Sequence, residues 1–249
     1  MNHNGMKTCL IIPVYNHENA IAKVIENLKR YGLPCVMVND GSSIACSQVL
    51  ADLADKEVSW LTLITRHENG GKGAAVIDGF KAAIAQAYTH AIQLDADGQH
   101  DVNAIPQFLA ASKQFPDALI LGQPIFDESV PKNRLYGRKI TNFWIRINTL
   151  SKAVADGMCG FRLYPLAAVQ QLISTKAIAQ RMDFDIDIVV RLYWQGVDVI
   201  NLPTSVSYPL DGVSHFRLWQ DNVFISKTHA RLFFGMLLRF PLLLWRRFR

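Results

Sequence analysis

Apolar, β-branched segments alternate with helix-like segments through the first half of the chain. Thr8–Val14 (TCLIIPV) is apolar almost throughout, as expected for a parallel strand buried on both faces. Further strands are predicted at Cys35–Asp40, Val58–Thr65, His90–Asp95 and Asp117–Gly122. The helices between them are predicted at Glu18–Tyr31, from Gly41–Ser43 to about Asp55, at Gly71–Tyr88 and at Val102–Phe115. This order predicts an α/β fold with a mostly parallel sheet flanked by helices.

The second half of the chain is less regular. Helices are predicted at Ile140–Val154, from about Leu166, and within Met182–Gly196, with a short strand at Val197–Pro203. A chain of 249 residues, half of them hydrophobic, suits one large domain. We therefore predict one domain over residues 1–221 and a separate basic tail over residues 222–249.

The positive charge of the chain is concentrated in that tail. The net charge is +5, yet no acidic residue follows Asp221, and six basic residues do. The rest of the chain is close to neutral, which does not favour a nucleic-acid partner. The four cysteines form no CxxC pair, and the N-terminus has no apolar segment of signal-peptide length, so a reduced, cytoplasmic location is expected.

Polar side chains follow three of the predicted strands at the points where they end. They are Tyr15 and Asn16 after the first strand, Asn39 and Asp40 at the end of the second, and Asp95 and Asp97 after the fourth. Ligands of such sheets bind beyond the carboxyl ends of the strands. One binding site at this edge is therefore expected.

The sequence DADGQ carries the most specific chemistry. If the strand continues, Asp95 and Asp97 face the same way, and Gln99 adds an amide oxygen. Hard oxygen ligands of this kind suit Mg²⁺ or Mn²⁺. A solvated turn, with Asp101 capping the next helix, is the alternative interpretation. The position at the end of a buried strand favours a metal site of Asp95, Asp97 and Gln99.

Two glycine-containing segments indicate nucleotide and anion contacts. In NDGSS, Asp40 can accept a hydrogen bond from a base or ribose hydroxyl, although Ser42 could equally make this segment a helix cap. ENGGKGAA places Lys72 and free backbone N–H groups at a helix N-terminus, which favours an anion. A tight loop without a ligand is the alternative there.

The later half offers a basic cluster and several acids. Arg138, with Lys132 and Arg134, could clamp a diphosphate together with His215 and Arg217, or these residues could form surface ion pairs. A general base is sought among four carboxylates, of which Asp156 and Asp185 are our candidates. On a helix, the other two, Asp183 and Asp187, lie on one face, and Asp185 points in another direction. The acids could also belong to a helix N-terminal turn and a solvated face.

The tail is amphipathic to apolar. Arg239 and Pro241 interrupt its apolar residues, and spanning a bilayer takes roughly 20 of them. An interfacial membrane helix, with arginines on anionic headgroups, is therefore predicted. A core-packing helix is the alternative.

The segments IIPVYNHENAI, VNDGSS, NGGKGAA, LDADGQH, DGMCGFRLYP and DFDIDIVVRLYWQG resemble family 2 glycosyltransferases of the GT-A fold. The resemblance covers about residues 8–202. Within the family it is similar to the polyprenol-phosphate hexosyltransferases, the dolichol-phosphate-mannose-synthase-like group. These enzymes often have a glutamate where His17 stands, with Glu18 following here, and an arginine near Gln123.

The resemblance implies inverting transfer of a hexose from a UDP- or GDP-sugar to a lipid or lipid-phosphate acceptor. Pro13, Tyr15 and Asp40 match nucleotide-binding positions, and Asn16, Glu18, Asn39 and Lys72 join them as candidates. Asp95, Ala96, Asp97 and Gln99 match the metal and diphosphate site, with Asp97 as the central catalytic ligand. The expected place of action is the cytoplasmic face of the inner membrane.

A lipid phosphate is already nucleophilic at neutral pH, because its second pKa is about 6. A hydroxyl acceptor would instead need a carboxylate base. Two other functions compete with this one: a nucleotide-sugar-binding scaffold without turnover, and nucleotidyl transfer. The complete DADGQ sequence argues against the first, and its pairing with NDGSS argues against the second.

Overall fold

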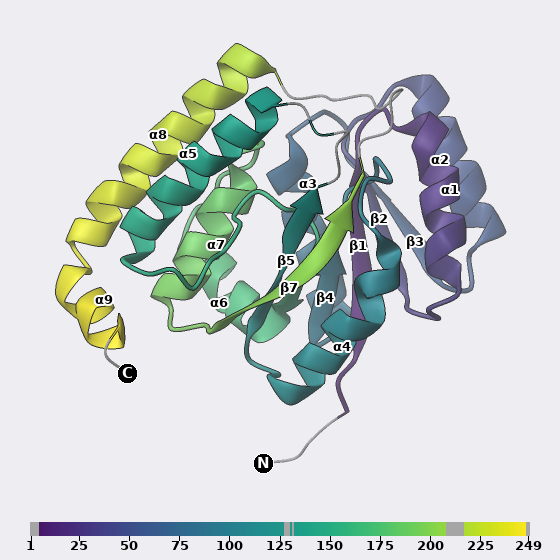
Figure 1. Cartoon of the computed structure of the whole chain (residues 1–249). Coiled ribbons are helices and arrows are strands. Elements are labelled where there is room, and N and C mark those ends of the chain that lie inside the picture. The colour runs from purple at the N-terminus through teal and green to yellow at the C-terminus, as the bar shows by residue number, and fades with distance from the viewer. Residues whose placement is uncertain (1–4, 127–129, 131, 208–216, 248–249) are drawn as a thin grey trace.

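The computed structural model describes residues 5–126, 130, 132–207 and 217–247. Its centre is a seven-stranded sheet of order β3-β2-β1-β4-β6-β5-β7 (Figure 1). The strands are β1 (Thr8–Val14), β2 (Cys35–Asn39), β3 (Leu61–Thr65), β4 (His90–Gln93), β5 (Leu119–Phe126), β6 (Arg162–Pro165) and β7 (Val199–Val206). The α/β fold with a mostly parallel sheet is thus confirmed.

Helices cover both faces of the sheet. Helices α1 (Glu18–Lys29), α2 (Ile44–Lys56) and α4 (Ile105–Gln114) lie on one face, and α3 (Lys72–Ala85), α6 (Leu166–Thr175) and α7 (Phe184–Trp194) on the other (Figure 1). Alternate residues of β1 enter the two cores, with Ile11 in one and Leu10 and Ile12 in the other. This is why β1 is apolar at successive positions.

Strand β6 was not predicted. It lies between β4 and β5 and runs antiparallel to both. Its four residues include Arg162, a charged side chain that a buried strand normally lacks, so the segment does not look like one. The guanidinium is fully buried and donates to the carbonyls of Gly157, Cys159 and Asp185, which satisfies it.

Several predicted boundaries move. Strand β4 ends at Gln93, so the alternation expected to align Asp95 with Asp97 does not extend to them. Helix α5 spans Lys132–Thr149 and therefore begins and ends earlier than predicted. Asp101 caps a 3₁₀ turn at Val102–Ala104, as expected of a cap. At α2 the cap is Ser43, whose Oγ accepts from the Cys46 N–H, and not Ser42.

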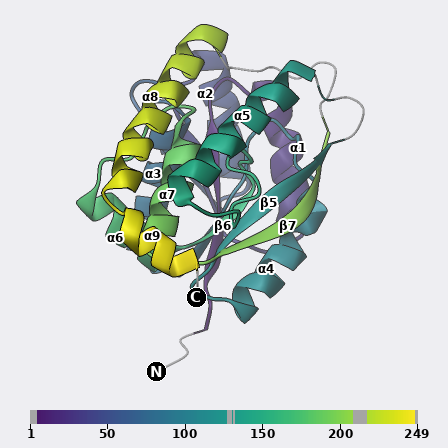
Figure 2. The same cartoon turned by 60° about the vertical axis from the view of Figure 1, so that its left-hand side comes forward.

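The chain ends in helices α8 (Leu218–Leu237) and α9 (Phe240–Arg247). Figures 1 and 2 show α8 alongside α5, and it also packs on α7. The boundary expected between residues 221 and 222 falls inside α8, whose Leu232 and Met236 are buried. Helix α8 therefore packs against the rest of the described protein through part of its length. Across the described ranges, no helix is long and apolar enough to cross a membrane.

Candidate active site

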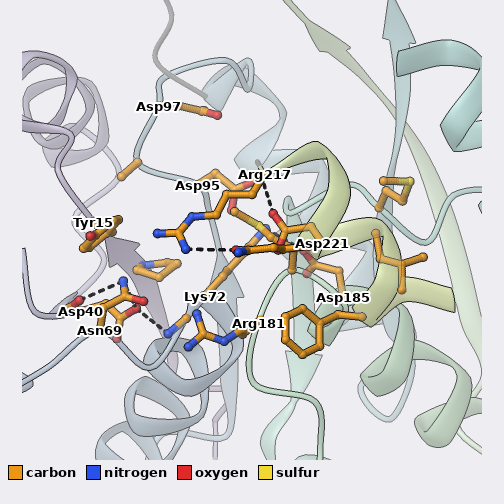
Figure 3. A pocket seen from close by; sticks show the side chains of 18 of the residues that line it. Tyr15, Asp40, Asn69, Lys72, Asp95, Asp97, Arg181, Asp185, Arg217 and Asp221 are labelled. Atoms are coloured by element: carbon orange, nitrogen blue, oxygen red, sulfur yellow. Dashed lines mark hydrogen bonds and ion pairs between the residues drawn. The ribbon is translucent and has the colours of Figure 1, made fainter. Parts of the chain in front are cut away.

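A cavity of about 650 Å³ opens beyond the carboxyl ends of β1, β2 and β4. The N-terminal turns of α3 and α8 form its other sides. In Figure 3, Asp40 and Asn69 lie toward one end, Asp185 and Asp221 toward the other, with Lys72 and Asp95 between them. The polar strand ends predicted to meet at one edge of the sheet do so.

Lys72 joins two carboxylates at the centre of the cavity. Its ammonium lies 2.7 Å from Asp95 Oδ1 and 2.7 Å from Asp185 Oδ2. Burial alone would lower the pKa of Lys72, but the charges of Asp185 and Asp95 outweigh it and raise that pKa. Lys72 therefore stays protonated, and its charge is matched within the protein.

Asp95 has a second basic neighbour, His100, at 3.5 Å. Burial would raise the pKa of Asp95, but Lys72 and His100 outweigh it and hold the pKa well below its usual range. The position of His100 was not predicted, because nothing in the sequence indicates that the loop folds back on Asp95.

Asp97 lines the same cavity and shows the opposite behaviour. Burial, and then the nearby charge of Asp95, raise the pKa of Asp97. The Oδ1 atom of Asp97 accepts a hydrogen bond from the Gln99 N–H. Gly98, which lies between these two residues, has a positive φ of +72° and turns the chain. No lysine or arginine forms an ion pair with Asp97 in the described ranges.

These residues fit a divalent cation whose remaining coordination positions are filled by the substrate. Two carboxylates close enough to repel each other, and the Gln99 side chain, line the cavity. Mg²⁺ and Mn²⁺ commonly take one or two carboxylates and fill the rest of their coordination with phosphates and water. Among the described residues, no three His, Cys, Asp or Glu side chains form a metal cluster by themselves.

Asp40 organises the loop before α3. Its carboxylate accepts from the Gly70 and Gly71 N–H groups and from Asn69 Nδ2, and lies 2.9 Å from Arg66 Nε. Burial raises its pKa, and the N–H groups and Arg66 partly oppose this. Asp40 and Asn69 both line the cavity, so the loop is anchored at the edge of the site.

Some of the residues predicted to bind the nucleotide line the cavity, and others hold the neighbouring backbone in place. Pro13, Tyr15 and Ala96 line the cavity as expected, and so does His17. Asn16 instead accepts from the Ser43 N–H, and Asn39 contacts Ser42 and Ser47. Neither these two asparagines nor Glu18 is among the lining residues.

Arg138 and Asp156 pair with each other at 2.5 Å and lie outside the cavity lining. Asp156 also accepts from Asn142 and from the Met158 and Cys159 N–H groups. Burial would raise the pKa of Asp156, but Arg138 outweighs it and lowers that pKa. Asp156 therefore anchors its own loop, and the structure places neither Asp156 nor Arg138 among the residues that line the cavity.

Asp185, a base candidate from the sequence, lines the cavity. Its carboxylate meets Lys72, Arg162 at 3.4 Å and Gln93 Nε2 at 3.3 Å. Asp187 points elsewhere, to Arg191 and Arg231, and Asp183 accepts from Thr228.

The side of the cavity formed by α8 was missed at the sequence level. Trp219 and Lys227 line it, and so does Arg217, which was predicted as a diphosphate contact. The Arg217 guanidinium donates to Gln220 and its N–H donates to Asp221. Arg181 lines the cavity next to Gly71, at the start of α3. In the described ranges Arg217 and Lys227 form no ion pair with a carboxylate. We call them the α8-side cations. His215, predicted beside Arg217, lies outside the described residues.

Gly160 was also missed. A Cβ at this position would collide with both carboxylate oxygens of Asp95. The glycine in MCGF therefore leaves the space in which the carboxylate sits.

Residues 9–173 match the family described as glycosyl transferase family 2. The chain belongs to this family. It is 29% identical over 216 residues to an uncharacterized protein of Methanocaldococcus jannaschii, covering 82% of this chain and 90% of the other. Polyprenol monophosphomannose synthase of Mycolicibacterium smegmatis is 25% identical over 214 residues, covering 84% and 80%.

A solved structure shares the fold of this family 2 glycosyltransferase. Glucosyl-3-phosphoglycerate synthase of Mycobacterium tuberculosis, in complex with Mn²⁺ and UDP-glucose, superimposes with a TM-score of 0.67. The match covers 94% of this chain and 80% of the other at 12% identity, which shows the fold alone. The resemblance to polyprenol-phosphate glycosyltransferases of this family is confirmed.

Proposed function

We propose that this enzyme transfers a hexose, with inversion, from a UDP- or GDP-sugar to a polyprenol phosphate at a membrane surface. The observation that carries this proposal is the lining of one cavity. It contains the carboxylates of Asp95 and Asp97, and it contains Arg217 and Lys227, which form no ion pair with a carboxylate in the described ranges. We place the donor at the carboxylates and the acceptor at these cations.

The donor lies along the strand ends. Tyr15 and Asp40 hold the base and ribose, and the diphosphate extends toward Asp95 and Asp97. Mg²⁺ or Mn²⁺, held by Asp95, Asp97 and Gln99, supplies charge stabilisation for the departing diphosphate. Burial, and then the nearby charge of Asp95, raise the pKa of Asp97, and a cation between the two carboxylates would relieve both effects.

The acceptor phosphate lies on the α8 side. Arg217 and Lys227 provide positive charge without carboxylate partners in the described ranges, and Trp219, Val223 and Phe224 provide apolar contacts for the first part of a prenyl chain. The relative named for making polyprenol monophosphomannose supports this acceptor class.

The phosphate attacks the anomeric carbon from the face opposite the leaving diphosphate. It needs no strong base, because at neutral pH it already carries negative charge. Asp185 is the carboxylate closest to this role, yet it is bound to Lys72. We therefore propose that Asp185 positions groups in the site and accepts a proton only if the acceptor is a hydroxyl.

Membrane contact is proposed for α5, the end of α8, and α9. Exposed apolar side chains gather on these helices: Ile140, Phe143, Phe234, Leu237, Leu238, Phe240, Leu242 and Trp245. Arg239 lies over Trp194 and Arg246 over Tyr193, so apolar contact, more than arginine–headgroup pairing, supports the interaction. The active face would then be the cytoplasmic face of the inner membrane.

The test is a donor panel. UDP- and GDP-hexoses labelled in the sugar are incubated with the protein, Mn²⁺ and vesicles containing undecaprenyl phosphate. We expect one donor to give a labelled lipid, loss of label transfer with EDTA, and a product of inverted anomeric configuration by NMR. No transfer and no donor hydrolysis with any sugar would contradict the proposal.

Membrane contact is tested with the double variant Leu238→Glu/Leu242→Glu, at positions that are 85% and 55% exposed. Vesicle co-sedimentation should fall several-fold while transfer to a short, soluble prenyl phosphate is kept. The control is Val58→Glu, which changes an equally apolar, 78% exposed residue far from α8 and α9 in the sequence. Equal sedimentation of all three proteins would contradict the contact.

A further inference from the structure

Lys72 makes contacts that anion binding does not account for. Its ammonium bridges Asp95 and Asp185, and its side chain is only 15% exposed. Asp95 follows β4 and Asp185 belongs to α7, so one side chain at the start of α3 ties together two elements of the fold. A lysine whose task was to receive a phosphate would face the open cavity without such partners.

The carboxylates near Lys72 outnumber its single positive charge. Asp95, Asp97 and Asp185 all line the cavity, while Lys72 serves two of them. Arg162 adds a contact to Asp185 only, at 3.4 Å. A divalent cation on Asp95 would therefore meet an ammonium that already neutralises this carboxylate, and like charges at such separations repel strongly.

Asp185 gives the ammonium another partner. When a cation binds Asp95, Lys72 can keep its contact with Asp185, so its positive charge still has a carboxylate partner. Its long, flexible side chain allows this shift without movement of α3.

We propose that Lys72 is an internal counter-ion of the donor-free site, replaced on Asp95 by the divalent cation and then retained by Asp185. This inference rests on the proposed function. It makes Lys72 a positioning residue: it lowers cation affinity before the donor binds, and it orders Asp185 once the cation is present.

The experiment measures Mn²⁺ binding to the donor-free protein by the EPR signal of free Mn²⁺. Lys72→Met removes the competing charge, so Mn²⁺ should bind at least about tenfold more tightly than to the native protein. The matched control is Lys81→Met on the same helix, a 63% exposed lysine that pairs with Asp78. Its affinity should equal that of the native protein. Transfer by Lys72→Met should show a lower KM for Mn²⁺ and a lower kcat.

Asp185→Asn provides a second variant if Lys72→Met does not fold. It leaves Lys72 to Asp95 alone, so Mn²⁺ affinity should fall several-fold. In a double variant, Lys72→Met/Asp185→Asn, Mn²⁺ affinity should return most of the way to the native value, because the lysine that competes with the cation is absent.

Equal Mn²⁺ affinity of Lys72→Met and native protein would overturn the counter-ion role while leaving transfer intact. Failure of the proposed function has another signature, since the native protein would then transfer no sugar at all. If no protein in the series binds Mn²⁺, the counter-ion role is also overturned.

Discussion

The two sides of the cavity differ in how their charges are matched. On the carboxylate side, Lys72 is shared by Asp95 and Asp185 at 2.7 Å each. On the α8 side, the side chains of Arg217 and Lys227 form no ion pair with a carboxylate in the described ranges. Asp97 resembles the α8-side cations in one respect, because no lysine or arginine of the described ranges forms an ion pair with it.

This difference indicates where ligands enter. Buried or partly buried charges are normally paired, and an unpaired one is a candidate contact for a charged ligand. Asp97 is partly buried, and we propose that it binds a cation. The α8-side cations are exposed, and their place in the cavity lining is what supports the proposal that they bind an anion. Lys72 differs from both, because its charge is already neutralised by Asp95 and Asp185.

The largest expected effect is at Asp97. Asp97→Ala should lower kcat/KM for transfer at least about 100-fold, because a direct ligand of the cation is lost. The control is Asp101→Ala, a nearby carboxylate that only caps the turn at Val102–Ala104 and should reduce stability by about 1 kcal/mol. Full activity of Asp97→Ala at saturating donor would remove the cation from the carboxylate side.

Gly160→Ala should disturb the same side without changing any charge. The added methyl group would force the Asp95 carboxylate away, so transfer should fall by about 10- to 100-fold and the metal KM should rise. Gly137→Ala makes the same chemical change on α5, where a Cβ meets nothing within 4 Å, and helical propensity should add up to about 1 kcal/mol of stability. Unaltered metal dependence of Gly160→Ala would mean that Asp95 is not a ligand.

On the α8 side, Lys227→Met should raise the KM for the lipid phosphate about tenfold and leave the KM for the donor within about twofold. Steady-state kinetics with each substrate varied in turn gives both values. A rise in donor KM alone would assign the lysine to the diphosphate and would break the division between the two sides.

A smaller effect concerns the support of α8. His229 lies between Asn148 and the Trp144 ring, and burial lowers its pKa to about 4. The unfolded chain, with a histidine pKa of about 6.5, binds this proton first. Stability should therefore fall by about 2 kcal/mol as pH decreases from 6.5 to 4.5. Urea unfolding should show a shallower pH dependence for His229→Gln, and an identical slope would contradict the assignment.

The sequence predicted the carboxylate side well because its residues follow regular strands. Asp40, Asp95 and Asp97 could be placed at one edge once β1, β2 and β4 were recognised by their apolar residues. Periodicity carries that information in a parallel sheet. It did not reveal β6, where a fully buried arginine hides a four-residue strand.

The α8 side could not be predicted in the same way. Trp219 and Lys227 belong to a segment that is amphipathic on its own, and its packing on α5 and α7 depends on contacts distant in sequence. The pairing of Asp156 with Arg138, 18 residues apart, likewise removes from the site two residues that their types alone suggested. The sequence gives no direct sign of such long-range ion pairs.

The most direct test is calorimetric binding of a short-chain prenyl phosphate to the donor-free protein, because it separates the two sides of the cavity without turnover. Native protein should bind it, Lys227→Met should bind about tenfold more weakly, and Asp97→Ala should bind at least as tightly as native. Loss of binding in Asp97→Ala with full binding in Lys227→Met would place the acceptor on the carboxylate side and contradict the account.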